Sequence, residues 1–229
     1  MLRRFRGLPA LLLTASLLAA CTTSPSAGPP VAAPASPAAS PSAAGCLWKP
    51  APAGPSVKDV GTPPAALPSA TGATMVLTTN LGAIEIALDP RATPCAVASF
   101  AFLAGKGFFD GTACHRLITE LLFVLACGDP SGTGEGGPGY RYAEEHLGND
   151  KGWLRGSVAV SHNDTRDANG SQFFVNYADN PELHHSYTPL GTVTKGMDLI
   201  DRVAAAGVTP GGTTPKLSLV VQHLTVVYS

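Results

Sequence analysis

The stretch GSVAVSHNDTRDANGSQFFV, residues 156–175, decides the fold class because two short apolar runs in it flank a polar turn. Residues 157–160 are typical of a strand, and residues 161–170 are rich in Asn, Asp and Thr, which favour turns. In the second apolar run, strand alternation places Gln172 and Phe174 on the same face. An amide beside an aromatic ring at a loop mouth can form a binding surface, although composition alone favours an ordinary core strand.

Similar short apolar runs with turns between them continue along the chain. We expect strands at residues 74–79, 83–88, 112–118, 121–127, 156–161, 171–176, 189–194 and 217–228. Thr93-Pro94 is a strong helix start, and Gly105 ends that helix. A second helix is expected at residues 196–205. About eight strands and two helices predict a mainly β domain, either a sandwich or a closed barrel.

The N-terminus reads as an export signal over residues 1–20. A basic start is followed by an apolar run at residues 8–20, which is shorter than the roughly 20 residues that span a bilayer. The run ends in small residues before Cys21, which resembles the cleavage and acylation site of bacterial lipoproteins. A plain signal peptide that ends near a cysteine is the alternative. The lipoprotein interpretation anchors the chain through Cys21 on the extracytoplasmic face of the cell membrane.

Residues 21–71 are rich in Pro, Ala, Ser and Gly, which favours an extended tether before a domain at residues 72–229. Cys46-Leu47-Trp48 interrupts this composition and either docks on the domain or is a chance apolar patch. The net charge of -1 argues against a nucleic-acid partner, and we expect a monomer.

Two motifs carry a resemblance to a known family. Asn169-Gly170-Ser171-Gln172-Phe173-Phe174 is one, and Cys114-His115-Arg116-Leu117 followed by Phe123 and Gly128-Asp129-Pro130 is the other. Together they resemble the cyclophilins, the peptidyl-prolyl cis-trans isomerases, from about Thr74 to the C-terminus. The resemblance implies a closed barrel of eight antiparallel strands capped by a helix at each end. It also implies isomerisation of Xaa–Pro bonds in proline-containing polypeptides without a metal or cofactor.

The resemblance assigns the site residues one by one. Arg116 matches the catalytic arginine, a permanent cation that can donate to the prolyl nitrogen, and Gln172 matches an amide that orients it. The pocket for the proline ring and neighbouring contacts match Phe123, Phe174, Leu183, Ser161 and His115. Spacing alone would favour a surface arginine and a plain apolar core at these positions.

Several positions depart from the family pattern. Ala126 replaces a glutamine that helps orient the arginine, and the segment at residues 116–129 is about two residues longer than usual. His162, or Asn163 in a different alignment of the loop, stands where an asparagine contacts the peptide. Glu182 replaces a tryptophan, which predicts weaker binding of cyclosporin, and Tyr187 replaces a histidine. These changes keep a second interpretation open, a cyclophilin barrel that binds peptides with little activity.

Four cysteines remain beside Cys21, and four cysteines allow three disulfide connectivities. Cys114 and Cys127 lie on strands that we expect to pair, which favours a disulfide between them and leaves Cys46 with Cys95. A glycine-rich run at residues 132–137 matches the spacing of a nucleotide-binding motif. Such a site needs a helix that begins there, and Pro138 argues against one, so we expect a loop. Acidic and histidine pairs at 144–146 and 184–185 lack ligand spacing, so no metal site is expected.

Overall fold

The structure is a computed structural model that describes residues 45–147, 152–162 and 166–229. The expected signal peptide at residues 1–20, the lipidation site Cys21, the tether up to residue 44 and Asn163 lie outside the described residues. Within the described ranges, neither helix has the length and apolar character needed to cross a bilayer.

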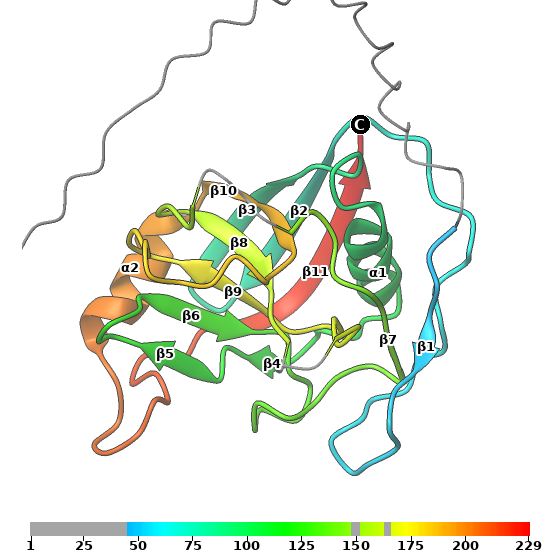
Figure 1. The fold of residues 1–229 in the computed structure, drawn as a ribbon. Coiled ribbons are helices and arrows are strands. Elements are labelled where there is room, and N and C mark those ends of the chain that lie inside the picture. The colour runs from blue at the N-terminus through cyan, green and yellow to red at the C-terminus, as the bar shows by residue number, and fades with distance from the viewer. Residues whose placement is uncertain (1–44, 148–151, 163–165) are drawn as a thin grey trace, which may run out of the picture. The chain divides into compact units, whose positions relative to one another are not determined.

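One antiparallel sheet of nine strands forms the body of the domain. Its order is β4 (Thr112–Ala113), β11 (Val220–Tyr228), β2 (Ala73–Thr79), β3 (Gly82–Leu88), β10 (Pro189–Lys195), β8 (Ser157–Val160), β9 (Phe173–Asn176), β6 (Val124–Cys127) and β5 (Arg116–Ile118). The sheet curves strongly, so that β2 and β11 lie on one side and β5 and β6 on the other (Figure 1).

The sheet corrects the prediction of a closed eight-stranded barrel. It has nine strands and is not closed, because the single strand expected at residues 112–118 is divided in two. Residues 112–113 pair with β11 and residues 116–118 pair with β6. The edge strands β4 and β5 therefore follow each other in the chain, separated by Cys114 and His115, instead of pairing.

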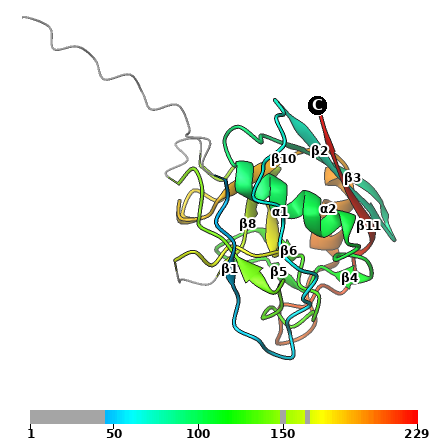
Figure 2. The ribbon, with the colours of Figure 1, turned by 90° about the vertical axis from the view of Figure 1, so that its right-hand side faces the viewer.

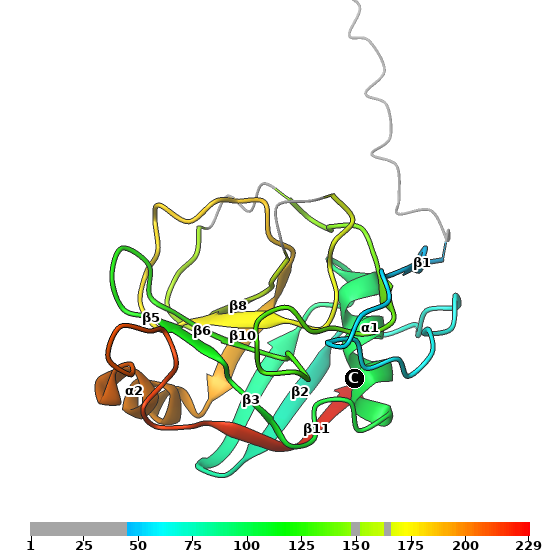
Figure 3. The same cartoon turned by 90° about the horizontal axis from the view of Figure 1, so that it is seen from below.

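The two helices lie at opposite ends of the curved sheet (Figures 1 and 3). α1 (Pro94–Gly105) begins after Thr93, as expected, but the Thr93 side chain makes no capping hydrogen bond. The carboxylate of Glu145 caps the helix instead, accepting from the backbone N–H groups of Cys95 at 2.9 Å and Ala96 at 2.7 Å. α2 (Met197–Ala206) begins after Gly196 and buries Leu199, Ile200 and Val203.

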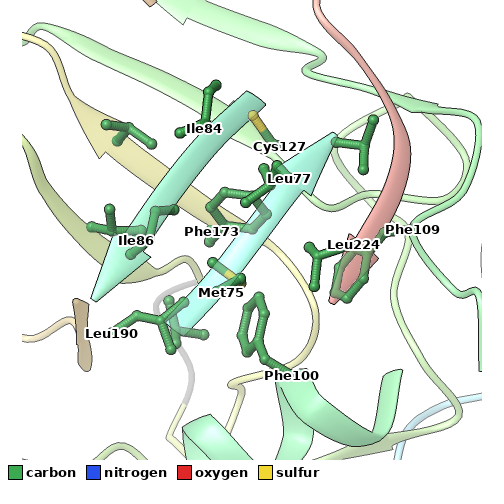
Figure 4. Packing of buried hydrophobic residues seen from close by; sticks show 14 of the residues in the cluster. Met75, Leu77, Ile84, Ile86, Phe100, Phe109, Cys127, Phe173, Leu190 and Leu224 are labelled. Carbon is green, nitrogen blue, oxygen red and sulfur yellow. The ribbon is translucent and has the colours of Figure 1, made fainter. Parts of the chain in front are cut away.

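The main core fills the space between α1 and the concave side of the sheet (Figure 4). Alternate residues of β2 and β3 point into it, among them Met75 and Ile86, which are fully buried. Phe100 of α1 lies against Phe109 at 5.6 Å and Phe173 at 5.8 Å between ring centroids. This packing fixes β9, and therefore the expected site residues Gln172 and Phe174 that flank Phe173.

Residues 45–59 form a strap that runs along the domain on the side of α1 (Figure 2). In the strap, β1 (Lys49–Pro50) pairs with β7 (Tyr140–Arg141) as a separate two-stranded sheet. Trp48 meets the ring edges of Tyr140 at 5.4 Å and Tyr142 at 5.5 Å. The composition of this segment favours a free tether, but the structure shows it packed on the domain through the buried Cys46 and the Trp48 ring.

Both expected disulfides are present. Cys46 is bonded to Cys95, which ties the strap to α1, and Cys114 is bonded to Cys127, which ties the link between β4 and β5 to β6. The Cys46–Trp48 patch therefore docks on the domain, which was one of the two alternatives open from the sequence.

Candidate functional site

A groove of about 460 Å³ lies beside the edge strand β5. Four of the site residues expected from the sequence line it, namely His115, Arg116, Ser161 and Gln172. The glycine-rich loop, residues 131–139, contributes Gly134, Gly136 and Gly137 to the same wall. The structure thus brings together two motifs that are more than 50 residues apart in the sequence.

Arg116 is the exposed cation of the groove, at the first position of β5. Its partner across the ladder is Ala126, whose methyl group cannot accept a hydrogen bond. In the described ranges, no hydrogen bond or ion pair engages the Arg116 guanidinium. A Cβ atom placed on Gly134 would lie 3.9 Å from Arg116 Nη2, so the loop leaves room beside the guanidinium.

Gln172 holds the glycine-rich loop. Its Nε2 donates to the backbone carbonyls of Gly134 at 2.9 Å and Gly136 at 2.8 Å. The resemblance implied that this amide orients Arg116, but these two bonds use both of its N–H groups on the loop. Gln172 can therefore act on Arg116 by fixing the loop beside it.

Asp129 holds the same loop from within. It is fully buried and accepts hydrogen bonds from the Ser131 N–H and hydroxyl, each at 2.7 Å, and from the Gly134 N–H. Burial would raise the pKa of Asp129, but these hydrogen bonds outweigh it and hold the pKa below its ordinary value. Gly136 must lack a side chain, because a Cβ there would lie 1.9 Å from Asp129 Oδ1.

His115 is half-buried next to Arg116, and it also faces the groove. Burial lowers the pKa of His115, and the charge of Arg116 lowers it further, against an opposing effect of Asp129. Its Nδ1 is buried and has no hydrogen-bond partner in the described part of the chain. A neutral imidazole here leaves Arg116 as the permanent charge at this end of the groove.

An apolar cluster adjoins the groove at Ala126, which belongs to both. Its buried members are Val124, Ala126, Trp153, Ala159, Phe174 and Leu183. Tyr187 packs against it, with its ring 5.1 Å from that of Phe174 and 4.9 Å from that of His162. Two expected pocket residues, Phe174 and Leu183, are thus together in this cluster, whose member Ala126 lies directly across the ladder from Arg116.

A family model described as cyclophilin type peptidyl-prolyl cis-trans isomerase matches residues 74–226. The chain belongs to the cyclophilin family. Over 204 residues it is 40% identical to the probable peptidyl-prolyl cis-trans isomerase B of Mycobacterium tuberculosis H37Rv, covering 80% of this chain and 65% of that protein. Peptidyl-prolyl cis-trans isomerase B of Bacillus subtilis 168 is 42% identical over 115 residues, or 50% of this chain and 78% of that one. The cyclophilin thus spans under two thirds of the length of its mycobacterial relative.

Solved structures agree with the fold of this cyclophilin. A crystal structure of a Cryptosporidium parvum cyclophilin type peptidyl-prolyl cis-trans isomerase superposes with a TM-score of 0.62 at 23% identity. The match covers 69% of this chain and 99% of that one. The same parasite protein in the presence of the dipeptide Ala-Pro gives a TM-score of 0.61 at 24% identity, covering 68% and 99% of the two chains.

Phe123 is the one expected pocket residue that the structure places apart from the apolar cluster of this cyclophilin. Its ring packs on Tyr177 at 5.9 Å, and its N–H donates to the Asn180 side chain at 2.8 Å. Leu122 and Ile118 pack on the cluster instead. The strand expected at residues 121–127 begins only at Val124, so alternation within that strand does not determine where Phe123 points.

Proposed function

We propose that this cyclophilin accelerates cis–trans isomerisation of Xaa–Pro bonds in polypeptides. One observation carries the proposal, namely that the Arg116 guanidinium, which has no partner among the described residues, lies in a groove across the ladder from Ala126, where the apolar cluster begins. Such a site offers a permanent donor next to a surface that can hold a proline ring. No group that forms a covalent intermediate is needed for this reaction.

The chemistry follows from the amide bond. Its rotation barrier is about 18–20 kcal/mol because resonance is lost as the bond twists. The prolyl nitrogen gains a free lone pair only in the twisted state. A hydrogen bond that Arg116 donates to that nitrogen therefore stabilises the transition state more than the ground state. The apolar cluster holds the ring while the preceding carbonyl turns. Gln172 and Asp129 fix the loop that borders the guanidinium.

A second candidate function is a peptide-binding module with weak activity. Ala126 favours it, because the residue opposite Arg116 offers no acceptor that would hold the guanidinium in one rotamer. The groove and the apolar cluster would then hold proline-containing segments without speeding their isomerisation.

Isomerisation of a short Xaa–Pro peptide by the full chain distinguishes the two functions. Enzyme function predicts acceleration that falls at least about tenfold in Arg116→Ala, which corresponds to about 1.4 kcal/mol of barrier. Arg202→Ala is the matched control, because Arg202 is exposed on α2, away from the groove. Peptide binding without acceleration would favour the binding module.

We further propose that the protein is exported, attached to the membrane through lipid on Cys21, and acts as a monomer on proteins that fold outside the membrane. The sequence before Cys21 supports export, and so do two disulfides, which persist in oxidising compartments. Mass spectrometry of the mature N-terminus tests the anchor. An acylated Cys21 is expected, and an unmodified N-terminus at another residue would refute it.

A further inference from the structure

The strap supplies part of the groove wall. Ala51, Pro52 and Val57 line the same cavity as Arg116 and Gln172. These strap residues lie outside the range 74–226 that matches the family model, so this wall comes from the segment that precedes the family-matched domain. Three of the five residues that the glycine-rich loop contributes to the lining are glycines, and the other two are Glu135 and Pro138. The strap therefore adds most of the apolar side chains on this part of the wall.

The strap is firmly attached where it borders the groove. Ala51 N–H donates to the Gly139 carbonyl at 3.0 Å, and Lys58 N–H donates to the Gly137 carbonyl at 3.0 Å. A Cβ atom on Gly136 would lie 2.9 Å from the Ser56 carbonyl oxygen, so the loop is enclosed between strap and Asp129. With the Cys46–Cys95 disulfide and the Trp48 contacts, these bonds hold the wall in place.

A second arginine faces this end of the groove. Arg141, on β7, pairs in register with Lys49 of the strap and lines the cavity. Its Nε is buried and has no partner in the described ranges. The described ranges thus hold no acceptor that commits the Arg141 guanidinium to an internal partner, and its terminal nitrogens can donate to a ligand in the groove.

The charges around Arg141 favour an acidic ligand. Asp167 is close enough to Arg141 for their charges to interact, but the Asp167 carboxylate is already ion-paired with Lys49 of the strap. Of the residues described as lining the groove, Arg116 and Arg141 carry permanent positive charges and Glu135 is the only acid.

We propose that Ala51, Pro52 and Val57 of the strap, together with Arg141, form a specificity-determining subsite that binds an acidic side chain of the polypeptide near its proline. The apolar strap residues contact the aliphatic part of that side chain, and Arg141 donates to its carboxylate. This subsite rests on the proposed function, because it selects among substrates of the same groove.

The test uses the full-length chain and pairs of peptides that differ only in Glu or Gln at one, two or three residues before the proline. The ratio of kcat/KM for the Glu peptide to that for the Gln peptide measures the selection. At one of the three positions we expect a ratio of about ten, the size expected for a hydrogen bond to a charged group. Arg141→Gln should bring this ratio close to one.

A matched pair of strap variants tests the wall itself. Ala51→Asp places an acid inside the subsite and should reverse the preference, so that the Gln peptide becomes the better substrate. Ala53→Asp adds the same charge on an exposed strap residue outside the groove lining and should keep the wild-type ratio. A wild-type ratio near one at all three positions, or equal ratios for the two variants, would overturn the subsite.

The same peptides separate failure of the subsite from failure of the enzyme proposal. Acceleration of all peptides without a Glu preference overturns the subsite and leaves the activity standing. If no peptide is accelerated, dissociation constants are measured by titration. A Glu preference in binding that Arg141→Gln abolishes would support the subsite in a binding module, and equal dissociation constants would overturn it.

Discussion

Arg116 lies directly opposite Ala126 in the β5–β6 ladder, and Ala126 is at once a wall of the groove and the edge of the apolar cluster. The ladder therefore sets the distance between the proposed donor and the proposed ring pocket through backbone hydrogen bonds. The ladder does not fix the guanidinium itself, because the methyl group of Ala126 cannot accept a hydrogen bond from it. This relationship makes position 126 the first place to test the mechanism.

Ala126→Gln should raise the activity. A glutamine carboxamide opposite Arg116 can accept from the guanidinium and narrow its rotamers, and a net gain of about 1 kcal/mol would give roughly fivefold in rate. The measurement is kcat and KM for an Xaa–Pro peptide. We expect the gain in kcat, because the affected bond forms in the transition state. Ala126→Leu is the control for added volume, and an equal gain in that variant would contradict the explanation.

Leu122→Ala should raise KM for the peptide more than Phe123→Ala does. Leu122 packs on the apolar cluster, whereas Phe123 packs on Tyr177 outside it. We expect Leu122→Ala to raise KM, and Phe123→Ala to lower the unfolding temperature with a smaller change in KM. Peptide kinetics and thermal unfolding of both variants provide the comparison, and the opposite pattern would return Phe123 to the pocket.

Asp129 should stabilise the fold in a pH-dependent way. Its pKa is held below its ordinary value, so its ionised form favours the folded state. That contribution is complete above the ordinary value of 3.8 and is lost as the pH falls through the lower folded value. Asp129→Asn should therefore be less stable at neutral pH and lose less stability in acid. Denaturant unfolding from neutral pH to about pH 2 tests this, and parallel curves for the two proteins would refute it.

The contribution of each disulfide to the free energy of unfolding can be measured separately. A variant with Cys114→Ala and Cys127→Ala keeps only the Cys46–Cys95 bond, and the reciprocal variant keeps only the other. In each, the free energy of unfolding is compared between the oxidised and the reduced protein. The sequence separations are 49 and 13, so loop-closure entropy predicts that Cys46–Cys95 contributes about 1 kcal/mol more. A smaller contribution from Cys46–Cys95 would show that the strap remains ordered without it.

Loss of the whole strap should lower stability more than loss of the Cys46–Cys95 disulfide alone, and it should also abolish the preference for Glu peptides. A chain that begins at residue 72 retains the nine-stranded sheet, but it uncovers the ring edges of Tyr140 and Tyr142 and removes one groove wall. We expect lower stability and a lost Glu preference compared with the full chain. Thermal unfolding and the Glu to Gln ratio report these two effects separately, and an unchanged ratio would contradict a role of the strap in selection.

Local sequence patterns were sufficient to predict several elements of this protein before any contact was known. Alternating apolar residues placed β2, β3, β8 and β9, Thr93-Pro94 and Gly105 bounded α1, and the two motifs identified the family before any geometry was known. The expected pairing of the segments around Cys114 and Cys127 predicted one disulfide and left Cys46 with Cys95 for the other.

Features that depend on contacts between residues far apart in the sequence became visible only in the folded chain. The division of residues 112–118 follows from two different partner strands, which no local pattern contains. Thr93 occupies the N-cap position, as predicted, but the hydrogen bonds that cap α1 come from the side chain of Glu145, 50 residues from Cys95. Composition makes the strap resemble a tether, because its prolines and alanines bury little surface by themselves. It becomes a groove wall only because the domain offers a partner strand, two tyrosine rings and a cysteine in the right places.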